Sequence, residues 1–154
     1  MQYLPLAEKI FLAGASVGLI FLFLNLDTLV LIASLIALAV IFFLSAYRPP
    51  EMPASENASQ GFQGLFAFVI LPKVLWIGCA VSAIGIALYL MGPTNDGYQL
   101  MLLIGGMSLL SDTGIFVFFL LKGTKHIELI SPIFFRAIPL LGASIYILLK
   151  VTPF

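Results

Sequence analysis

The sequence predicts an all-α membrane protein with five transmembrane helices. Hydrophobic residues make up 62% of the 154 residues and charged residues only 9%, which leaves too little polar surface for a water-soluble fold of this size. The apolar residues fall in five long runs, at about the 20 residues that a helix needs to cross a bilayer. Runs of this length favour helices over barrel strands, which would alternate in segments of about 10 residues. The runs are 10–26, 28–47, 74–91, 98–121 and 129–149.

The first two runs end at recognisable signals. The run 10–26 is short and Asn25 nearly ends it, so apolar residues at 3–6 are expected to lengthen this helix. No small-residue cleavage site follows the run, which predicts a retained helix rather than a cleaved signal peptide. The second run closes at Tyr47, before a segment, 48–61, rich in Pro, Ser and Glu that predicts an irregular linker.

The last three runs differ in what they carry. The apolar stretch 62–71 precedes 74–91, and one helix over both would have about 30 residues and a length of roughly 45 Å, too long for an untilted span. We therefore interpret 62–71 as an interfacial preface. The run 74–91 holds the single cysteine, Cys79, predicted to be a buried thiol. The run 98–121 holds an acid, and the last run a basic residue.

The positive charges predict the orientation. Six of the seven Lys and Arg residues lie on one side of the five runs, and only Lys150 lies on the other. Because cations gather in cytoplasmic segments, we expect a multi-pass protein of the cell inner (plasma) membrane with a cytoplasmic N-terminus and an external C-terminus. The six are Lys9, Arg48, Lys73, Lys122, Lys125 and Arg136.

An internal repeat divides the chain into two hairpins and a fifth helix. Residues 9–18 align without gaps on 73–82, with the basic residue and the first glycine in register. Each segment continues to an acidic turn and a second span, which predicts two parallel-repeated helical hairpins of the same orientation. The expected parts are a first hairpin (1–47), a cytoplasmic linker (48–61), the preface with the second hairpin (62–121), and the fifth transmembrane helix (122–154).

Small residues predict where helices approach each other closely. They recur at helical spacing in the first, third and fourth runs, as in GxxxG contacts between membrane helices. Two interpretations stay open, packing within the chain and an interface between copies of it. The residues are Gly14, Gly18, Gly78, Ser82, Gly85 and Gly105.

Asp112 is the most informative residue, because it lies within the fourth run. An acid at the centre of a span costs about 3 kcal/mol, and the apolar residues around it return about 4 to 8 kcal/mol, so the span still inserts. Ser108 and Ser111 have hydroxyls that can donate to it. Asp112 then either handles a proton or ion, or forms an ion pair with Arg136, which a hairpin turning near Lys125 would place at similar depth.

Each hairpin carries short apolar motifs: residues 41–50, which read IFFLSAYRPP, in the first, and Gly78, 84–85, 101–105 and 112–116 in the second. These motifs resemble the GldL family, the two-helix inner-membrane subunit of the gliding and type-nine secretion motor. The resemblance covers each hairpin separately and implies a proton-powered, stator-like assembly. The resemblance implies that the family's membrane glutamate corresponds to Asp112 in the second hairpin, with three residues inserted after Gly105. The same position in the first hairpin is Leu38, so that hairpin lacks the acid.

The chain departs from that family at three places. Tyr89 and Leu22 stand where the family has a basic residue near the outer end of its first helix. The long cytoplasmic tail expected after the hairpin is absent. The departures point to a duplicated relative whose second hairpin retains the acid and whose first has become a scaffold.

The function expected from the sequence is that of a small integral inner-membrane protein, a subunit or accessory of a larger membrane assembly, proton-linked through Asp112. The alternatives are a small transporter with a midplane site at the repeat interface, and a purely structural helix-packing protein. One His, one Cys and no phosphate loop or basic groove predict no enzyme, cofactor, metal or nucleic acid. The expected partners are the lipid bilayer and further copies of the chain or other membrane subunits.

Overall fold

The computed structural model describes residues 4–24, 28–48, 69–92, 97–121 and 127–151, and these form five helices. The predicted linker 48–61, the preface 62–71 and the loop around Lys125 lie almost wholly outside the described residues. In the described part the regular structure is all helical, as predicted. The helices are α1 (Leu4–Phe23), α2 (Leu29–Ala46), α4 (Leu71–Met91), α5 (Gly97–Leu121) and α6 (Ile127–Val151).

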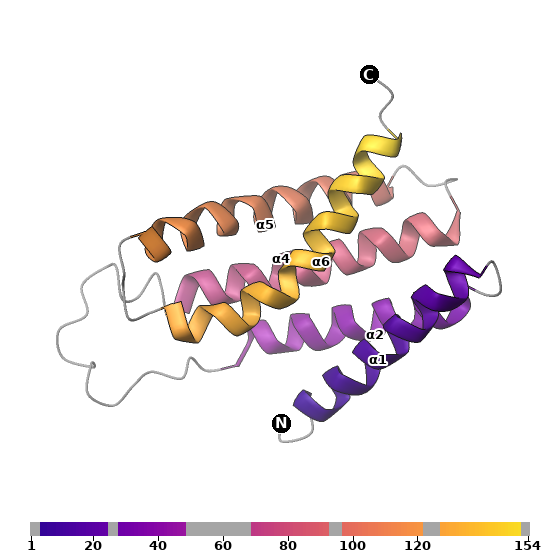
Figure 1. Cartoon of the computed structure of the whole chain (residues 1–154), viewed down its shortest axis with the longest axis horizontal. Coiled ribbons are helices and arrows are strands. Elements are labelled where there is room, and N and C mark those ends of the chain that lie inside the picture. The colour runs from indigo at the N-terminus through magenta and orange to yellow at the C-terminus, as the bar shows by residue number, and fades with distance from the viewer. Residues whose placement is uncertain (1–3, 25–27, 49–68, 93–96, 122–126, 152–154) are drawn as a thin grey trace.

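The helices form two layers. α2, α4 and α5 lie side by side, and α1 and α6 cross the same face of that layer, α1 over α2 and α6 over α4 and α5 (Figure 1). Successive helices run in opposite directions. The starts of α1, α4 and α6 therefore share one end of the bundle with the ends of α2 and α5, and we name this the starting end.

Small residues set the distance between the helices of each hairpin. A Cβ on Gly18 of α1 would lie 2.6 Å from the Cα of Leu31 in α2, so only glycine permits this approach. In the second hairpin a Cβ on Gly105 would overlap the Ser82 hydroxyl, and one on Gly85 would lie 2.9 Å from Leu102 Cγ. The predicted packing residues thus contact the other helix of their own hairpin.

The core is apolar along most of its length. At the starting end Phe42 of α2 packs on Trp76 of α4, with ring centroids 5.4 Å apart. At the opposite end Tyr89 and Tyr98 face each other at 5.6 Å across the α4–α5 turn. This turn follows Gly92, whose φ of 126° is readily adopted only by glycine. Large apolar side chains also cover the outward faces, as in a helix bundle surrounded by lipid.

Four described helical segments are long and apolar enough to cross a membrane: Leu29–Ala46, Leu71–Met91, Gly97–Leu121 and Ile133–Val151. They support a multi-pass membrane protein. α1 has 20 residues, about 30 Å of helix, but is not among the four. A fifth span therefore remains a prediction.

The two hairpins share a use of glycine but differ in where their helices touch. Gly14 lies against Ser34 and Gly78 against Leu109, each in the second helix of its own hairpin. The contact of Gly78 lies farther from the turn of its hairpin than the contact of Gly14 does. α4 continues for 13 residues beyond Gly78, whereas α1 continues for only nine beyond Gly14. The parallel repeat therefore stays a prediction.

Candidate functional site

Asp112 is the most deeply buried charged residue in the described part of the chain. It lies on α5, nine residues before Leu121, and only 2% of it is exposed. The same face of α5 carries Leu109 and Phe116, which belong to the apolar core. No hydrogen-bond partner for Asp112 Oδ2 is found among the described residues. The carboxyl group therefore lies in apolar surroundings with at least one oxygen unpaired.

Of the two serines predicted to serve Asp112, Ser111 lies on another face of α5, and Ser108 lies one turn before Asp112 on a neighbouring position of the same face. Ser111 is exposed, and its hydroxyl donates a 2.9 Å hydrogen bond to the Met107 carbonyl of its own helix. Ser108 is half-buried and faces α4, where its Oγ would lie 3.2 Å from a Cβ on Gly78. The expectation that Ser111 donates to Asp112 is therefore wrong, because the helical turn points its hydroxyl elsewhere.

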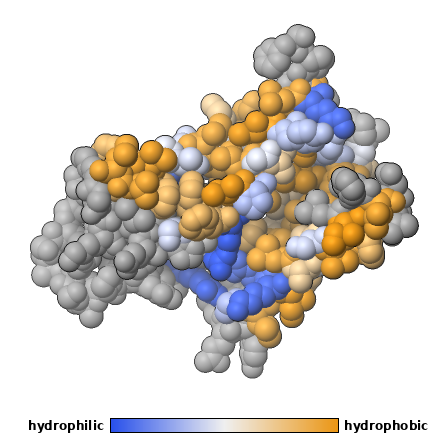
Figure 2. All heavy atoms as spheres, in the orientation of Figure 1, coloured by the Kyte–Doolittle hydropathy of each residue, from blue (hydrophilic) through white to orange (hydrophobic). Residues whose placement is uncertain are grey.

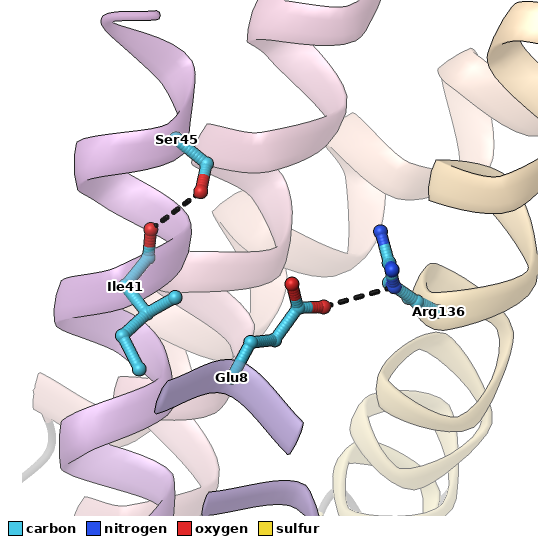
Figure 3. Close-up of polar contacts among 4 residues, drawn as sticks. All are labelled: Glu8, Ile41, Ser45 and Arg136. Atoms are coloured by element: carbon cyan, nitrogen blue, oxygen red, sulfur yellow. Dashed lines mark hydrogen bonds and ion pairs between the residues drawn. The ribbon is translucent and has the colours of Figure 1, made fainter. Parts of the chain in front are cut away.

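Arg136 pairs with Glu8 rather than with Asp112. The Arg136 Nε lies 2.9 Å from Glu8 Oε1, and the two side chains face each other between α6 and α1 (Figure 3). The contact is an ion pair without aligned hydrogen-bond geometry. The guanidinium also lies over the Trp76 ring, 5.7 Å from its centroid. The predicted Asp112–Arg136 pair is thus corrected, because the start of α1 reaches α6 across the bundle.

Sequence reasoning assigned no role to Glu8. The residue is buried, with a side chain 9% exposed, although the next residues of α1, from Lys9 to Ala13, are exposed. Its signal in the sequence is an acid flanked by Leu4, Leu6, Ile10 and Phe11. An acid one turn inside an apolar helix requires a partner, just as a midspan acid does.

The register of α5 and α6 places Arg136 close to the depth of Asp112. Phe116 stacks on Phe134 with centroids 4.2 Å apart, and a Cβ on Gly106 would lie 3.8 Å from Ser144 Cβ. These two contacts agree on one antiparallel register, in which Ile138 lies opposite Asp112. Arg136 is two residues away, about 3 Å along the helix axis.

Cys79 of α4 lies in the same apolar core as Leu109 and Phe116, which flank Asp112 on α5, and as Ala137, the neighbour of Arg136 on α6. Its thiol is buried. We refer to Glu8, Cys79, Asp112 and Arg136 as the polar cluster. The four side chains come from four helices, α1, α4, α5 and α6. The cluster lies in the half of the bundle nearer the starting end.

Two further buried hydroxyls lie nearer the opposite end. Ser82 of α4 touches Gly105, and Ser144 of α6 touches Gly106, so both flank the same turn of α5. Both are 0% exposed, and neither hydroxyl has a hydrogen-bond partner within the described chain. From Gly105 to Asp112 is about 10 Å along α5, so these hydroxyls are separate from the polar cluster.

The surface above the cluster is hydrophilic. Among the described residues in Figure 2, hydrophobic residues cover most of the face, and hydrophilic residues gather between α1 and α6 and again at the end of α6. Arg136 has 39% of its side chain exposed, so the polar cluster is partly open to this surface at Arg136. Within the described residues, no three His, Cys, Asp or Glu side chains are grouped to hold a metal ion.

Comparison with known protein families, curated proteins and solved structures found no match.

Proposed function

We propose that this protein is a subunit or accessory of a larger inner-membrane assembly and that it takes up and releases a proton at Asp112. The observation that carries the proposal is the burial of Asp112 among apolar residues without a partner for Oδ2. An ionised carboxylate is very costly in such surroundings, and a neutral one is tolerated. Proton exchange is thus the chemistry available to this group.

The ion pair between Glu8 and Arg136 supports this assignment over a purely structural one. Arg136 was the cation expected to neutralise Asp112, and its Nε is engaged 2.9 Å from Glu8. A helix-docking role for Asp112 needs a bound partner, whereas a proton-exchanging role needs a carboxyl group that a proton alone can neutralise. The arrangement favours the second role.

The role in an assembly rests on the resemblance to the GldL family and on the outward faces of the helices. Large apolar side chains such as Val40, Leu103, Met107 and Phe118 are exposed along α2 and α5. Such faces suit lipid, further copies of the chain or other membrane subunits equally well. The cytoplasmic N-terminus and external C-terminus are part of the same proposal, from the distribution of cations.

A small transporter is the second candidate. It is favoured by the buried hydroxyls of Ser82 and Ser144, which have no partners within the described residues and share a depth on either side of α5. A transporter moves its ion through the isolated protein. A subunit takes up the proton but needs its partners to move it further.

The test uses the full chain in lipid vesicles, with infrared absorption of protonated carboxyl groups and a pH-sensitive dye as readouts. Asp112→Asn is expected to remove one carboxyl band and the associated proton uptake, and Asp112→Glu to retain part of both. Ser111→Ala is the matched control, because its hydroxyl is on the same helix but bonds to Met107. An unchanged spectrum and uptake in Asp112→Asn would refute the proton site. Steady proton flux through the purified chain would favour the transporter.

A further inference from the structure

Arg136 lies beside one carboxyl group, that of Glu8, and at nearly the same depth in the bundle as a second, that of Asp112. Its Nε lies 2.9 Å from Glu8 Oε1. The α5–α6 register places Asp112 only about 3 Å away from it along the bundle axis, on the neighbouring helix. A long arginine side chain hinged on α6 therefore has one partner on α1 and a second potential partner on α5.

The other described cations lie nearer the ends of their helices than Arg136 does, with Arg48 just after the end of α2. Lys9 is exposed on α1, Lys73 lies at the first turn of α4, and Lys150 lies in the last turn of α6 at the opposite end of the bundle. Leu29–Ala46, the whole of α2, contains no ionisable side chain. The groups that face the cluster from the packed helices are thus Glu8, Cys79, Asp112 and Arg136.

The contact between Glu8 and Arg136 bridges two helices whose main packing partners are other helices. α1 packs on α2, and α6 packs on α4 and α5. Glu8 lies in the first half of α1, which crosses α2 at an angle (Figure 1), and its carboxylate points toward α6 (Figure 3). Arg136 is half exposed, and beyond this pair it is steadied by Trp76. Movement of the guanidinium therefore disrupts little of the core.

We propose that Glu8 is a positioning residue for the proton site: by holding Arg136, it keeps the guanidinium away from Asp112 and so allows Asp112 to retain a proton. The inference rests on the proposed function of Asp112. With Glu8 neutral, Arg136 turns to Asp112 and stabilises its carboxylate. The bridge between α1 and α6 then opens, so the proton on Asp112 and the position of α1 are coupled.

The test is an infrared titration of the Asp112 carboxyl band in the full chain in lipid vesicles. Glu8→Gln is expected to shift the midpoint of Asp112 protonation to lower pH by about one unit or more, a tenfold loss of proton affinity, as for a carboxyl group that gains a cation nearby. Arg136→Gln is expected to leave the midpoint unchanged or shift it to higher pH. Glu8→Asp, which retains the pair, is expected to behave like the unmodified chain.

The outcomes separate a positioning role from a structural one. A purely structural ion pair is broken alike by Glu8→Gln and Arg136→Gln, so shifts in the same direction would overturn the inference. An Asp112 band that titrates normally in Glu8→Gln would also overturn it and leave the proton site intact. If the unmodified chain has no band that Asp112→Asn removes, the proposed function itself fails.

Lys9→Gln, which removes an exposed charge beside Glu8, is the matched control and is expected to leave the midpoint of Asp112 protonation unchanged. If Glu8→Gln fails to fold, the Arg136→Gln and Glu8→Asp titrations carry the test, and a shift to lower pH in Arg136→Gln overturns the inference.

Discussion

At the residue scale, the buried polar side chains fall into two groups. Ser45 and Thr113 donate to carbonyls four residues earlier in their own helices, at 2.8 and 2.7 Å, the usual way to satisfy a hydroxyl inside a membrane helix. Ser82, Ser144 and Asp112 each have a buried oxygen that finds no partner in the described residues. Such groups weaken a fold by about 1–3 kcal/mol each, so their presence points to function rather than to packing.

This difference predicts opposite effects of removing a hydroxyl. Ser144→Ala is expected to leave the free energy of unfolding unchanged or to raise it by about 1 kcal/mol, because no hydrogen bond is lost. Ser45→Ala, a control that is also buried, loses its bond to the Ile41 carbonyl and is expected to lower the free energy of unfolding. Thermal unfolding in detergent measures both. A clear loss of stability in Ser144→Ala would mean that its hydroxyl is already bound.

At the element scale, contacts between helices depend on individual glycines. α4 and α5 meet where Gly105 faces Ser82, and a Cβ at Gly105 would lie 2.8 Å from the Ser82 backbone nitrogen. Backbone atoms cannot move aside as a flexible side chain can. The separation of the two helices is therefore fixed by the absence of a side chain at this position.

Gly105→Ala is accordingly expected to force α4 and α5 apart and to destabilise the protein by about 1–3 kcal/mol. Gly114→Ala is the control in the same helix, because a Cβ there meets nothing within 4 Å. It is expected to be neutral or to stabilise the helix by up to about 1 kcal/mol. The midpoints of thermal unfolding distinguish the two, and equal midpoints would contradict the tight contact.

At the scale of the whole molecule, the ends of the bundle differ in charge. Arg48, Lys73 and Arg136 lie toward the starting end, and Lys150 lies at the other. With α1 as a fifth span, the starting end faces the cytoplasm. The ion pair between Glu8 and Arg136 agrees with this arrangement, because it brings the first halves of α1 and α6 together at one end.

Cysteine labelling tests the orientation in a Cys79→Ser background. Tyr47→Cys lies at the starting end, where Tyr47 is 67% exposed, and Gly97→Cys lies at the other, on the exposed first residue of α5. In intact cells a membrane-impermeant thiol reagent is expected to label Gly97→Cys and to leave Tyr47→Cys unlabelled. Both are expected to react once the membrane is opened. The reverse pattern would invert the proposed topology.

The sequence by itself determined the helical class, the four apolar spans that the structure describes, and Asp112 as the residue that needs explanation. These follow from hydropathy, a local property that bilayer thickness converts directly into helix length. It also placed Arg136 near the depth of Asp112, because depth in a hairpin can be counted from its turn.

Only the tertiary structure decided which groups face one another. Glu8 reaches Arg136 from the far end of the chain, and the Ser111 hydroxyl is directed to its own helix. Which face a helix turns inward, and which helices become neighbours, depend on close packing between segments distant in sequence. In lipid, where apolar faces are equivalent, hydropathy carries no information on that choice.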